Sequence, residues 1–273
     1  MTAQSAEAIS YPAPTGKPLG TNSYFKFGAG VLIPILNIFT KRNWKGAENI
    51  PQSGPMIAVC NHISYADVLV FSQFLYQNGR APRYLGKAEV FRIPFIGKII
   101  AGSGQIPVER ESENAHLALQ HAIAFLKSGH CVGVYPEGTL TRDPGIWPMR
   151  AKTGVARLAL MSGAPVIPCA QWGAQELLPR YGKLPRLWKR TKISVVAGKP
   201  VDLSRWAGKS DDPVALAEAT AEIMSAVTRL LEEIRGESAP AEIFDLHASD
   251  LPKTGNFLKD KSKKSKKSKR SEG

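Results

Sequence analysis

The sequence predicts an α/β fold, in which a mixed, mostly parallel sheet is flanked by helices. Short apolar runs of strand length alternate with longer segments whose apolar residues recur at helical spacing. This alternation is typical of a sheet whose successive strands are joined by helices. With 273 residues and 43% hydrophobic content, the chain is long enough to bury a sizeable core as one large domain with appendages.

Six runs have the length and the composition of strands, and five segments have the periodicity of helices. The predicted strands cover residues 56–60, 83–86, 105–108, 131–135, 166–171 and 193–197. The predicted helices cover residues 64–76, 94–101, 113–127, 152–161 and 213–234. These elements place one folded domain over residues 45–236.

The segment before this domain is expected to contact a membrane. Residues 1–23 are polar and proline-containing, which predicts a disordered segment without a secretory signal. The predicted membrane-associated segment covers residues 24–44. Its apolar part, residues 24–40, is broken only by Lys26 and Asn37, and Lys41, Arg42 and Trp44 follow it as at a membrane interface. At about 1.5 Å per residue, a helix over residues 24–40 is shorter than a hydrocarbon core of about 30 Å. An interfacial helix is therefore expected, and a soluble helix packed on the domain is the alternative.

The chain is basic, with a net charge of +13. Residues 259–273 hold eight Lys or Arg against two acidic residues, so this end carries +6 and the rest carries +7. Residues 237–273 are predicted to form a disordered polybasic tail. Such a tail suits anionic lipid head groups, with nucleic acid binding or simple solubility as alternatives, and specific nucleic acid recognition is not expected. The basic stretch 180–192 suits a membrane surface or a solvated loop.

Several familiar chemistries lack their residues. Cys60, Cys131 and Cys169 lie in separate apolar runs without a C-x-x-C pair, which indicates core residues in a reducing compartment rather than disulfides or a zinc site. The chain has no G-x-S-x-G elbow, H-E-x-x-H motif or phosphate-binding glycine loop. Serine hydrolase, zinc protease and nucleotide-binding classes are therefore excluded, and no metal or cofactor is expected.

A histidine and a carboxylate follow the first predicted strand of the domain. His62 and Asp67 would lie about 140° apart on one helix, so His62 should precede the helix in order to reach Asp67. Ser64 is then the expected N-cap, with Asp67 at the third helical position as in a capping box. There the carboxylate can turn back toward the His62 ring. The alternative is that Asp67 only caps a helix beside an ordinary loop histidine.

Two further polar clusters end apolar strands. Arg110 follows the strand 105–108, where its guanidinium suits a phosphate or forms a surface ion pair with a neighbouring glutamate. Glu137, Gly138, Thr139 and Arg142 follow the strand 131–135, at the end of a sheet where α/β sites usually form. A simple turn capped by Glu137 is the alternative for this second cluster.

These clusters, taken in order, resemble the four motif blocks of the glycerolipid acyltransferases, and most closely the bacterial 1-acylglycerol-3-phosphate acyltransferase family. The blocks are H-x-x-x-x-D at His62 and Asp67, G-x-x-x-x-x-R ending at Arg110, Y-P-E-G-T at residues 135–139 and V-I-P at residues 166–168. The resemblance covers roughly residues 44–200. It implies a fold like that of these acyltransferases, with His62 as general base and Asp67 as the residue that orients it.

The resemblance also implies which residues bind the acceptor. Arg110 and the Glu137-Gly138-Thr139 block would bind its phosphate and glycerol portion, and Lys87 is a further phosphate candidate. The family commonly has Arg three residues after the Glu, whereas this chain has Leu140 there and Arg142 two positions later. Arg142 is therefore added to the candidate set, and the identity of the acceptor stays open.

The implied reaction moves a fatty acyl group from acyl-CoA or acyl carrier protein to the sn-2 hydroxyl of lysophosphatidate, at the cytoplasmic face of the membrane. An imidazole with a pKa near its ordinary value of roughly 6.5 is neutral and basic enough to deprotonate this alcohol. Other acceptors within the class are glycerol 3-phosphate, another lysophospholipid or a glycolipid. A rival outside the class is a non-enzymatic protein whose basic tail grips RNA or an acidic partner.

Overall fold

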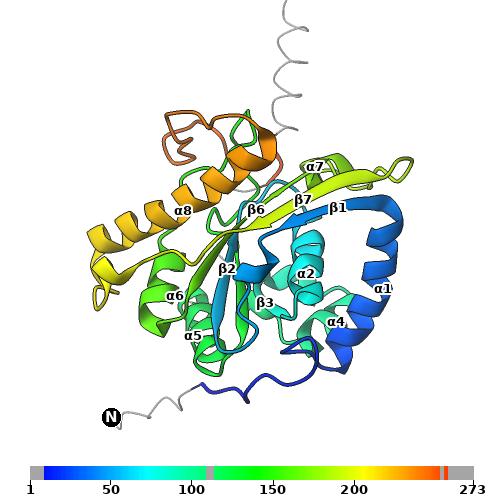
Figure 1. Cartoon of the computed structure of the whole chain (residues 1–273), viewed down its shortest axis with the longest axis horizontal. Coiled ribbons are helices and arrows are strands. Elements are labelled where there is room, and N and C mark those ends of the chain that lie inside the picture. The colour runs from blue at the N-terminus through cyan, green and yellow to red at the C-terminus, as the bar shows by residue number, and fades with distance from the viewer. Residues whose placement is uncertain (1–8, 109–113, 253–254, 258–273) are drawn as a thin grey trace, which may run out of the picture.

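The computed structural model describes residues 9–108, 114–252 and 255–257, and its centre is a seven-stranded sheet (Figure 1). The strands are β1 Thr40–Lys45, β2 Met56–Cys60, β3 Pro82–Lys87, β4 Ile106–Val108, β5 Cys131–Val134, β6 Val166–Trp172 and β7 Thr191–Ala197. Their order is β1-β7-β6-β2-β5-β3-β4. The five strands from β6 to β4 are parallel, whereas β7 pairs antiparallel with β6 and parallel with β1. The predicted mixed, mostly parallel sheet is confirmed.

Helices cover both faces of this sheet (Figure 1). They are α1 Ser23–Phe39, α2 Asp67–Gln77, α3 Ala88–Phe91, α4 Ile96–Gly102, α5 Asn114–Lys127, α6 Gly154–Ser162, α7 Ala174–Leu177 and α8 Pro213–Arg235, with short 3-10 turns η1 Ala47–Asn49 and η2 Ser204–Trp206. The side chains of successive β2 residues point to opposite faces of the sheet. Met56, Ala58 and Cys60 pack with α2, whereas Ile57 and Val59 pack with α5, α6 and α8. Because all five β2 residues are buried, this strand reads as one continuous apolar run.

The predicted strands and helices are found within a few residues of their expected positions, but three elements are additional. β1 was not predicted, because its sequence Thr-Lys-Arg-Asn-Trp-Lys has the composition of a charged flank. It forms a strand because it pairs along its length with β7. The helices α3 and α7 have four residues each, which is too short to show helical periodicity.

Parts of both chain ends pack on the domain, which the predicted disorder of residues 1–23 and 237–273 did not anticipate. The Tyr11 ring stacks on Phe125 at 3.6 Å between centroids, and its hydroxyl lies 2.6 Å from Nδ1 of His121. At the other end, Leu246 is buried and Asp245 pairs with Arg150 at 3.0 Å. Single aromatic and aliphatic side chains hold these segments, and such anchors leave no periodic signal in the sequence. Residues 1–8, 253–254 and 258–273 of these ends lie outside the described residues.

The apolar N-terminal segment forms α1, which runs along the outside of the domain (Figure 1). Leu36 is its buried residue, and it belongs to the core cluster that also contains α2. The opposite side of α1 leaves large apolar side chains exposed, among them Tyr24, Phe27, Val31, Ile35 and Ile38. Within the described ranges, no helix has the length and hydropathy needed to cross a membrane.

Candidate functional site

His62 and Glu137 come together because the strands that carry them are parallel neighbours. The carboxyl ends of β2, β3, β5 and β6 lie at one edge of the sheet, where an α/β fold usually forms its site. His62 follows β2 at the centre of the sheet, and Glu137 follows the neighbouring strand β5. Lys87 ends β3, on the far side of β5.

His62 and Asp67 form the expected pair. Nδ1 of His62 lies 2.9 Å from Oδ2 of Asp67, with the His62 side chain 14% exposed and the Asp67 side chain fully buried. The same oxygen of Asp67 accepts hydrogen bonds from the backbone N–H groups of Ile63, at 2.5 Å, and Ser64, at 2.8 Å. An ionised Asp67 therefore accepts a hydrogen bond from the protonated Nδ1 of His62, which leaves Nε2 of the imidazole as the basic nitrogen.

The helix start differs from the predicted capping box in one respect. α2 begins at Asp67 itself, and its N-cap is Ala66 rather than Ser64. Asp67 does reach back to the N–H of Ser64, but the Ser64 hydroxyl accepts from the N–H of Ala66 and donates to the carbonyl of Leu178 at 2.6 Å. The serine is thus used to tie this loop to the segment after α7, which delays the helix.

Burial raises the pKa of Asp67 above its ordinary value. The hydrogen bond and the charge of His62 lower it, as do the N–H groups of Ser64 and Ile63, so these contacts offset part of the cost of burial. The other carboxylate oxygen, Oδ1, is buried without a hydrogen-bond partner among the described residues. The Asp67 charge is therefore held mainly by its contacts on one oxygen.

Glu137 lies behind His62 and holds its backbone. It is 3% exposed, and Oε1 accepts from the N–H of His62 at 3.0 Å while Oε2 accepts from the N–H of Met149 at 3.2 Å. Burial raises the pKa of Glu137 to about 8, against the opposing effect of these two N–H groups. Both oxygens of this carboxylate are thus engaged by the protein itself.

The residues after Glu137 complete the hold on His62. Gly138 has a left-handed backbone with φ of +69° and, like Thr139, is half-buried. The N–H of Thr141 donates to the carbonyl of His62 at 2.7 Å, so both peptide groups of His62 are fixed by the loop after β5. Thr141 is not among the predicted site residues, and its only sequence signal is a hydroxyl group two positions after a motif block.

Two other contacts of the site were also missed. The ring of Tyr135 stacks on His62, with 4.3 Å between ring centroids and 25° between planes. Asn61 joins β2 to β6, since its side chain accepts from the N–H of Gln171 at 2.8 Å and donates to its carbonyl at 3.0 Å. Each contact had a weak signal in the sequence. Asn61 and Gln171 are polar residues at the ends of two apolar runs, and Tyr135 is an aromatic residue at the end of a third.

The remaining candidates are more scattered. Lys87 is half-exposed and pairs with Glu89 at 3.2 Å. Arg142 is 1% exposed and donates from Nη2 to the carbonyl of Gly255 at 3.2 Å. Arg110 lies outside the described residues, so its predicted place beside the phosphate stays a prediction.

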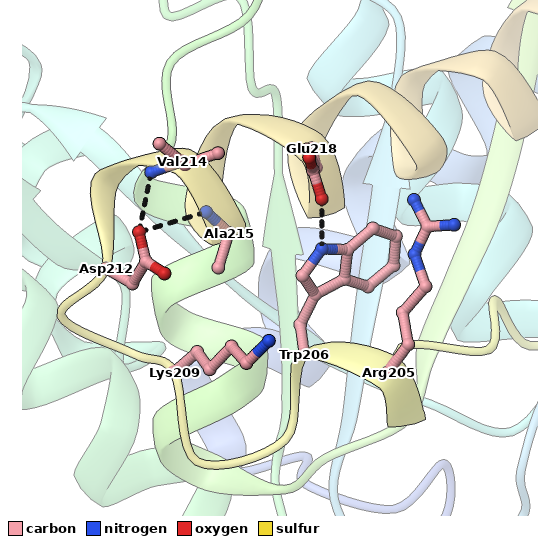
Figure 2. Close-up of a pocket in the computed structure, with 7 residues that line it drawn as sticks. All are labelled: Arg205, Trp206, Lys209, Asp212, Val214, Ala215 and Glu218. Carbon is pink, nitrogen blue, oxygen red and sulfur yellow. Dashed lines mark hydrogen bonds between the residues drawn. The ribbon is translucent and has the colours of Figure 1, made fainter.

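Other possible sites lie away from this edge. Over the described ranges, no three His, Cys, Asp or Glu side chains gather as metal ligands. A pocket at the start of α8 is formed by residues of η2, of α8 and of the turn between them (Figure 2). In this pocket the indole N–H of Trp206 donates to Oε2 of Glu218 at 3.0 Å. None of the motif residues named above lines this pocket. The residues that line this pocket come after the carboxyl end of β7 in the chain. Because β7 runs antiparallel to β6, that end lies at the edge of the sheet opposite to the one that carries His62.

The chain is similar to several known proteins. Residues 41–172 match a family model described as acyltransferase. The chain is 29% identical over 179 residues to the 1-acyl-sn-glycerol-3-phosphate acyltransferase of Bacillus subtilis, covering 65% of this chain and 82% of that protein. It is 30% identical to a chloroplastic protein of that name from Brassica napus, covering 60% and 46%. It also superposes on the crystal structure of the 1-acyl-sn-glycerophosphate acyltransferase PlsC of Thermotoga maritima, with a TM-score of 0.61, 25% identity, and 79% and 81% of the two chains covered.

Proposed function

We propose that this chain is a member of the acyltransferase family and that it transfers a fatty acyl group to the sn-2 hydroxyl of lysophosphatidate, giving phosphatidate. The observation that carries this proposal is the His62–Asp67 pair, held at 2.9 Å at the carboxyl end of the central strand β2. The curated relatives named above are 1-acyl-sn-glycerol-3-phosphate acyltransferases, which supports this acceptor.

In the proposed mechanism, His62 is the general base. Nε2 takes the proton of the acceptor hydroxyl as its oxygen attacks the carbonyl carbon of the acyl thioester. The tetrahedral intermediate then expels the thiolate of the donor, and the imidazolium returns the proton to that sulfur. Asp67 fixes the tautomer through Nδ1 and stabilises the imidazolium while it carries the proton. The acyl group thus passes directly from donor to acceptor.

Glu137 acts in this proposal as a positioning residue. Its two oxygens bind the backbones of His62 and Met149, so its part in the acceptor site is indirect. Gly138, Thr139, Arg142, Lys87 and Arg110 remain the proposed contacts for the acceptor's glycerol and phosphate. Gly138 and Thr139 suit this role because they are partly exposed beside the His62 loop.

The donor is proposed to be acyl-CoA or acyl carrier protein, as a co-substrate rather than a cofactor. A thioester carries its own activated carbonyl, so the described chemistry of His62 and Asp67 needs no metal ion or prosthetic group. A second candidate function uses another acceptor, such as glycerol 3-phosphate, another lysophospholipid or a glycolipid. It is favoured by Leu140, which is buried where the family commonly has Arg.

We further propose that α1 and α4 dock the enzyme on the cytoplasmic face of the membrane. The exposed apolar side of α1 meets that of α4, where Phe95 is 68% and Ile96 is 51% exposed. A shallow apolar groove between the two helices is lined by Ser23, Tyr24, Phe27, Phe95 and Ile99. Exposed Lys26 and Lys98 lie on the same helices and suit anionic head groups. Such docking would bring the site to a lipid acceptor.

The reaction is tested with purified protein, labelled acyl-CoA and acyl carrier protein, and a panel of acceptors. Lysophosphatidate should be acylated fastest, and His62→Ala should lower the rate by about 10³-fold or more. His116→Ala, an exposed histidine on α5, is the matched control and should match the wild type. Equal rates for His62→Ala and wild type would refute the mechanism. Preference for a glycolipid would refute the acceptor, and salt-sensitive RNA binding without acyl transfer would favour the non-enzymatic rival.

A further inference from the structure

The C-terminal part of the chain returns to the edge of the sheet that carries His62. Figure 1 shows its orange segment beyond the end of α8, at the same edge of the molecule as α7. The carbonyl of Gly255 accepts from Nη2 of Arg142 at 3.2 Å, and the Phe257 side chain is 4% exposed. This end of the chain therefore covers Arg142, one of the residues predicted to bind the acceptor substrate.

Phe257 is enclosed by two arginines and a tyrosine. The guanidinium carbons of Arg142 and Arg180 each lie 5.2 Å from the centroid of the Phe257 ring. The ring of Tyr181 meets it edge-on, with 5.7 Å between centroids. One neutral aromatic side chain thus lies against two positive charges at once.

Arg142 lacks part of the hydrogen bonding that a buried cation usually has. Nε and Nη1 of Arg142 and the hydroxyl of Tyr181 are buried without a hydrogen-bond partner among the described residues. The described ion pairs include neither Arg142 nor Arg180. Unpaired guanidinium N–H groups are costly to bury, so an anion in the place of the ring would stabilise this arrangement.

Both arginines are linked to Thr141, whose backbone N–H binds His62. Arg142 is the next residue in the chain, and Arg180 binds the carbonyl of Thr141. Nη1 of Arg180 donates to the carbonyls of Thr141, at 2.7 Å, and Asp143, at 3.1 Å. The N–H of Thr141 in turn bonds to the carbonyl of His62. The segment of Arg180 is also tied to the same loop through the bond from Ser64 to Leu178. A group bound by both arginines is therefore close to the proposed base.

Arg180 stands outside the four motif blocks, and it supplies a cation where this chain lacks one. At the position where the family commonly has Arg, this chain has the buried Leu140. Arg180 comes instead from the segment after α7 and reaches the loop that contains Leu140 and Arg142. Two guanidinium groups with a free hydroxyl offer the several donors that a phosphate group requires.

We propose that Arg142 and Arg180 together form the site for the phosphate of the acceptor, and that Phe257 occupies this site until the acceptor displaces it. The inference rests on the proposed function, since it deepens the assignment of a phosphate-bearing acceptor. Nε and Nη1 of Arg142 and the Tyr181 hydroxyl are the donors that the phosphate oxygens would take. Arg180 then determines specificity for phosphate-bearing over neutral acceptors.

The role of Arg180 is tested with two acceptors, lysophosphatidate and monoacylglycerol, which lacks the phosphate. Arg180→Gln should raise the KM for lysophosphatidate by about tenfold while kcat changes less than about twofold, and should leave the KM for monoacylglycerol unchanged. Arg180→Lys, which keeps the charge and loses the fork, should have an intermediate KM. Arg229→Gln, an exposed change on α8, is the control and should match the wild type. An equal loss of kcat with both acceptors and an unchanged KM would mean that Arg180 only supports its loop, which overturns the proposal.

The role of Phe257 is tested in the full-length chain. Phe257→Ala should lower the KM for lysophosphatidate by roughly fivefold, because it raises the fraction of protein with an open site, whereas Ile243→Ala in the same segment should not. Without any acyl donor, lysophosphatidate should speed hydrogen exchange in the peptide that contains Phe257, and monoacylglycerol should not. Unchanged KM and unchanged exchange would overturn the displacement.

The exchange measurement separates this inference from the proposed function, because it needs no turnover. A protein that releases the peptide on binding lysophosphatidate but acylates only another acceptor supports the phosphate site and overturns the proposed reaction. A protein that acylates lysophosphatidate with no effect of Arg180→Gln or Phe257→Ala supports the reaction and overturns this inference.

Discussion

The carboxylate of Glu137 accepts a hydrogen bond from the backbone N–H of His62 at 3.0 Å, across 75 positions of sequence. Its second oxygen binds the N–H of Met149, and Thr141 binds the carbonyl of His62. The peptide groups on both sides of His62 are thus fixed by the loop after β5, while the imidazole is oriented separately by Asp67. Backbone position and ring orientation of the proposed base have different sources.

We expect Glu137→Gln to lower kcat by about tenfold or more and the free energy of unfolding by roughly 1–3 kcal/mol. Glutamine has one carbonyl oxygen, so one of the two N–H donors from His62 and Met149 would face its amide NH₂ group. Initial rates near pH 8.5 and urea unfolding measure the two effects. Glu222→Gln, an exposed change on α8, is the control. A normal kcat in Glu137→Gln would show that this bond does not position His62.

The raised pKa of Glu137 predicts a pH dependence of stability. Its pKa is about 8 in the folded protein, against an ordinary value of 4.5. Between these values the unfolded chain releases the proton and the folded chain keeps it. The free energy of unfolding should therefore fall as pH rises through this window, by at most about 1.4 kcal/mol per pH unit, and level off above it. Urea unfolding of wild type and Glu137→Gln from about pH 5 to 9 measures this, and parallel curves would contradict it.

Asp67→Asn should separate activity from stability. The amide cannot supply the negative charge that stabilises the imidazolium, so we expect kcat to fall by about 10²- to 10⁴-fold. Because burial raises the pKa of Asp67 and so disfavours its charge, the free energy of unfolding should change by less than about 1 kcal/mol. Single-turnover kinetics and urea unfolding are the measurements, with the exposed change Asp202→Asn as control. A kcat within fivefold of wild type would refute the orienting role.

The α1 face should govern binding to lipid vesicles. Phe27 and Ile35 are 53% and 46% exposed, and replacing both with Asp adds charge to the centre of the apolar face. Co-sedimentation with anionic vesicles should weaken by about tenfold or more, while the fold is retained because neither residue is buried. Val214→Asp, 66% exposed on α8, is the matched control. Equal sedimentation of both variants would place the membrane contact elsewhere.

The fold class and the pair at its centre are readable from local sequence. β2 is an unbroken apolar run because both its faces are buried, and α5, α6 and α8 show helical spacing because one side of each packs on the sheet. His62 precedes α2 and Asp67 begins it, so their five-residue separation allows them to meet, and the resemblance to the acyltransferases favours this pair over a simple helix cap. These signals depend only on residues that are close together in the sequence, so they can be read without knowing the order of the strands.

What the sequence could not determine depends on the order of strands in the sheet. Only once β2 and β5 lie side by side does Glu137 reach the backbone of His62, with its pKa raised by the burial that follows. The same holds for β1, which is a strand because β7 is its neighbour, and for Phe257, which reaches Arg142 and Arg180 from beyond the end of α8. Contacts between residues far apart in sequence carry no periodicity of their own. The sequence by itself determined which residues carry the proposed reacting groups, and the tertiary structure decided which residues fix those groups in position.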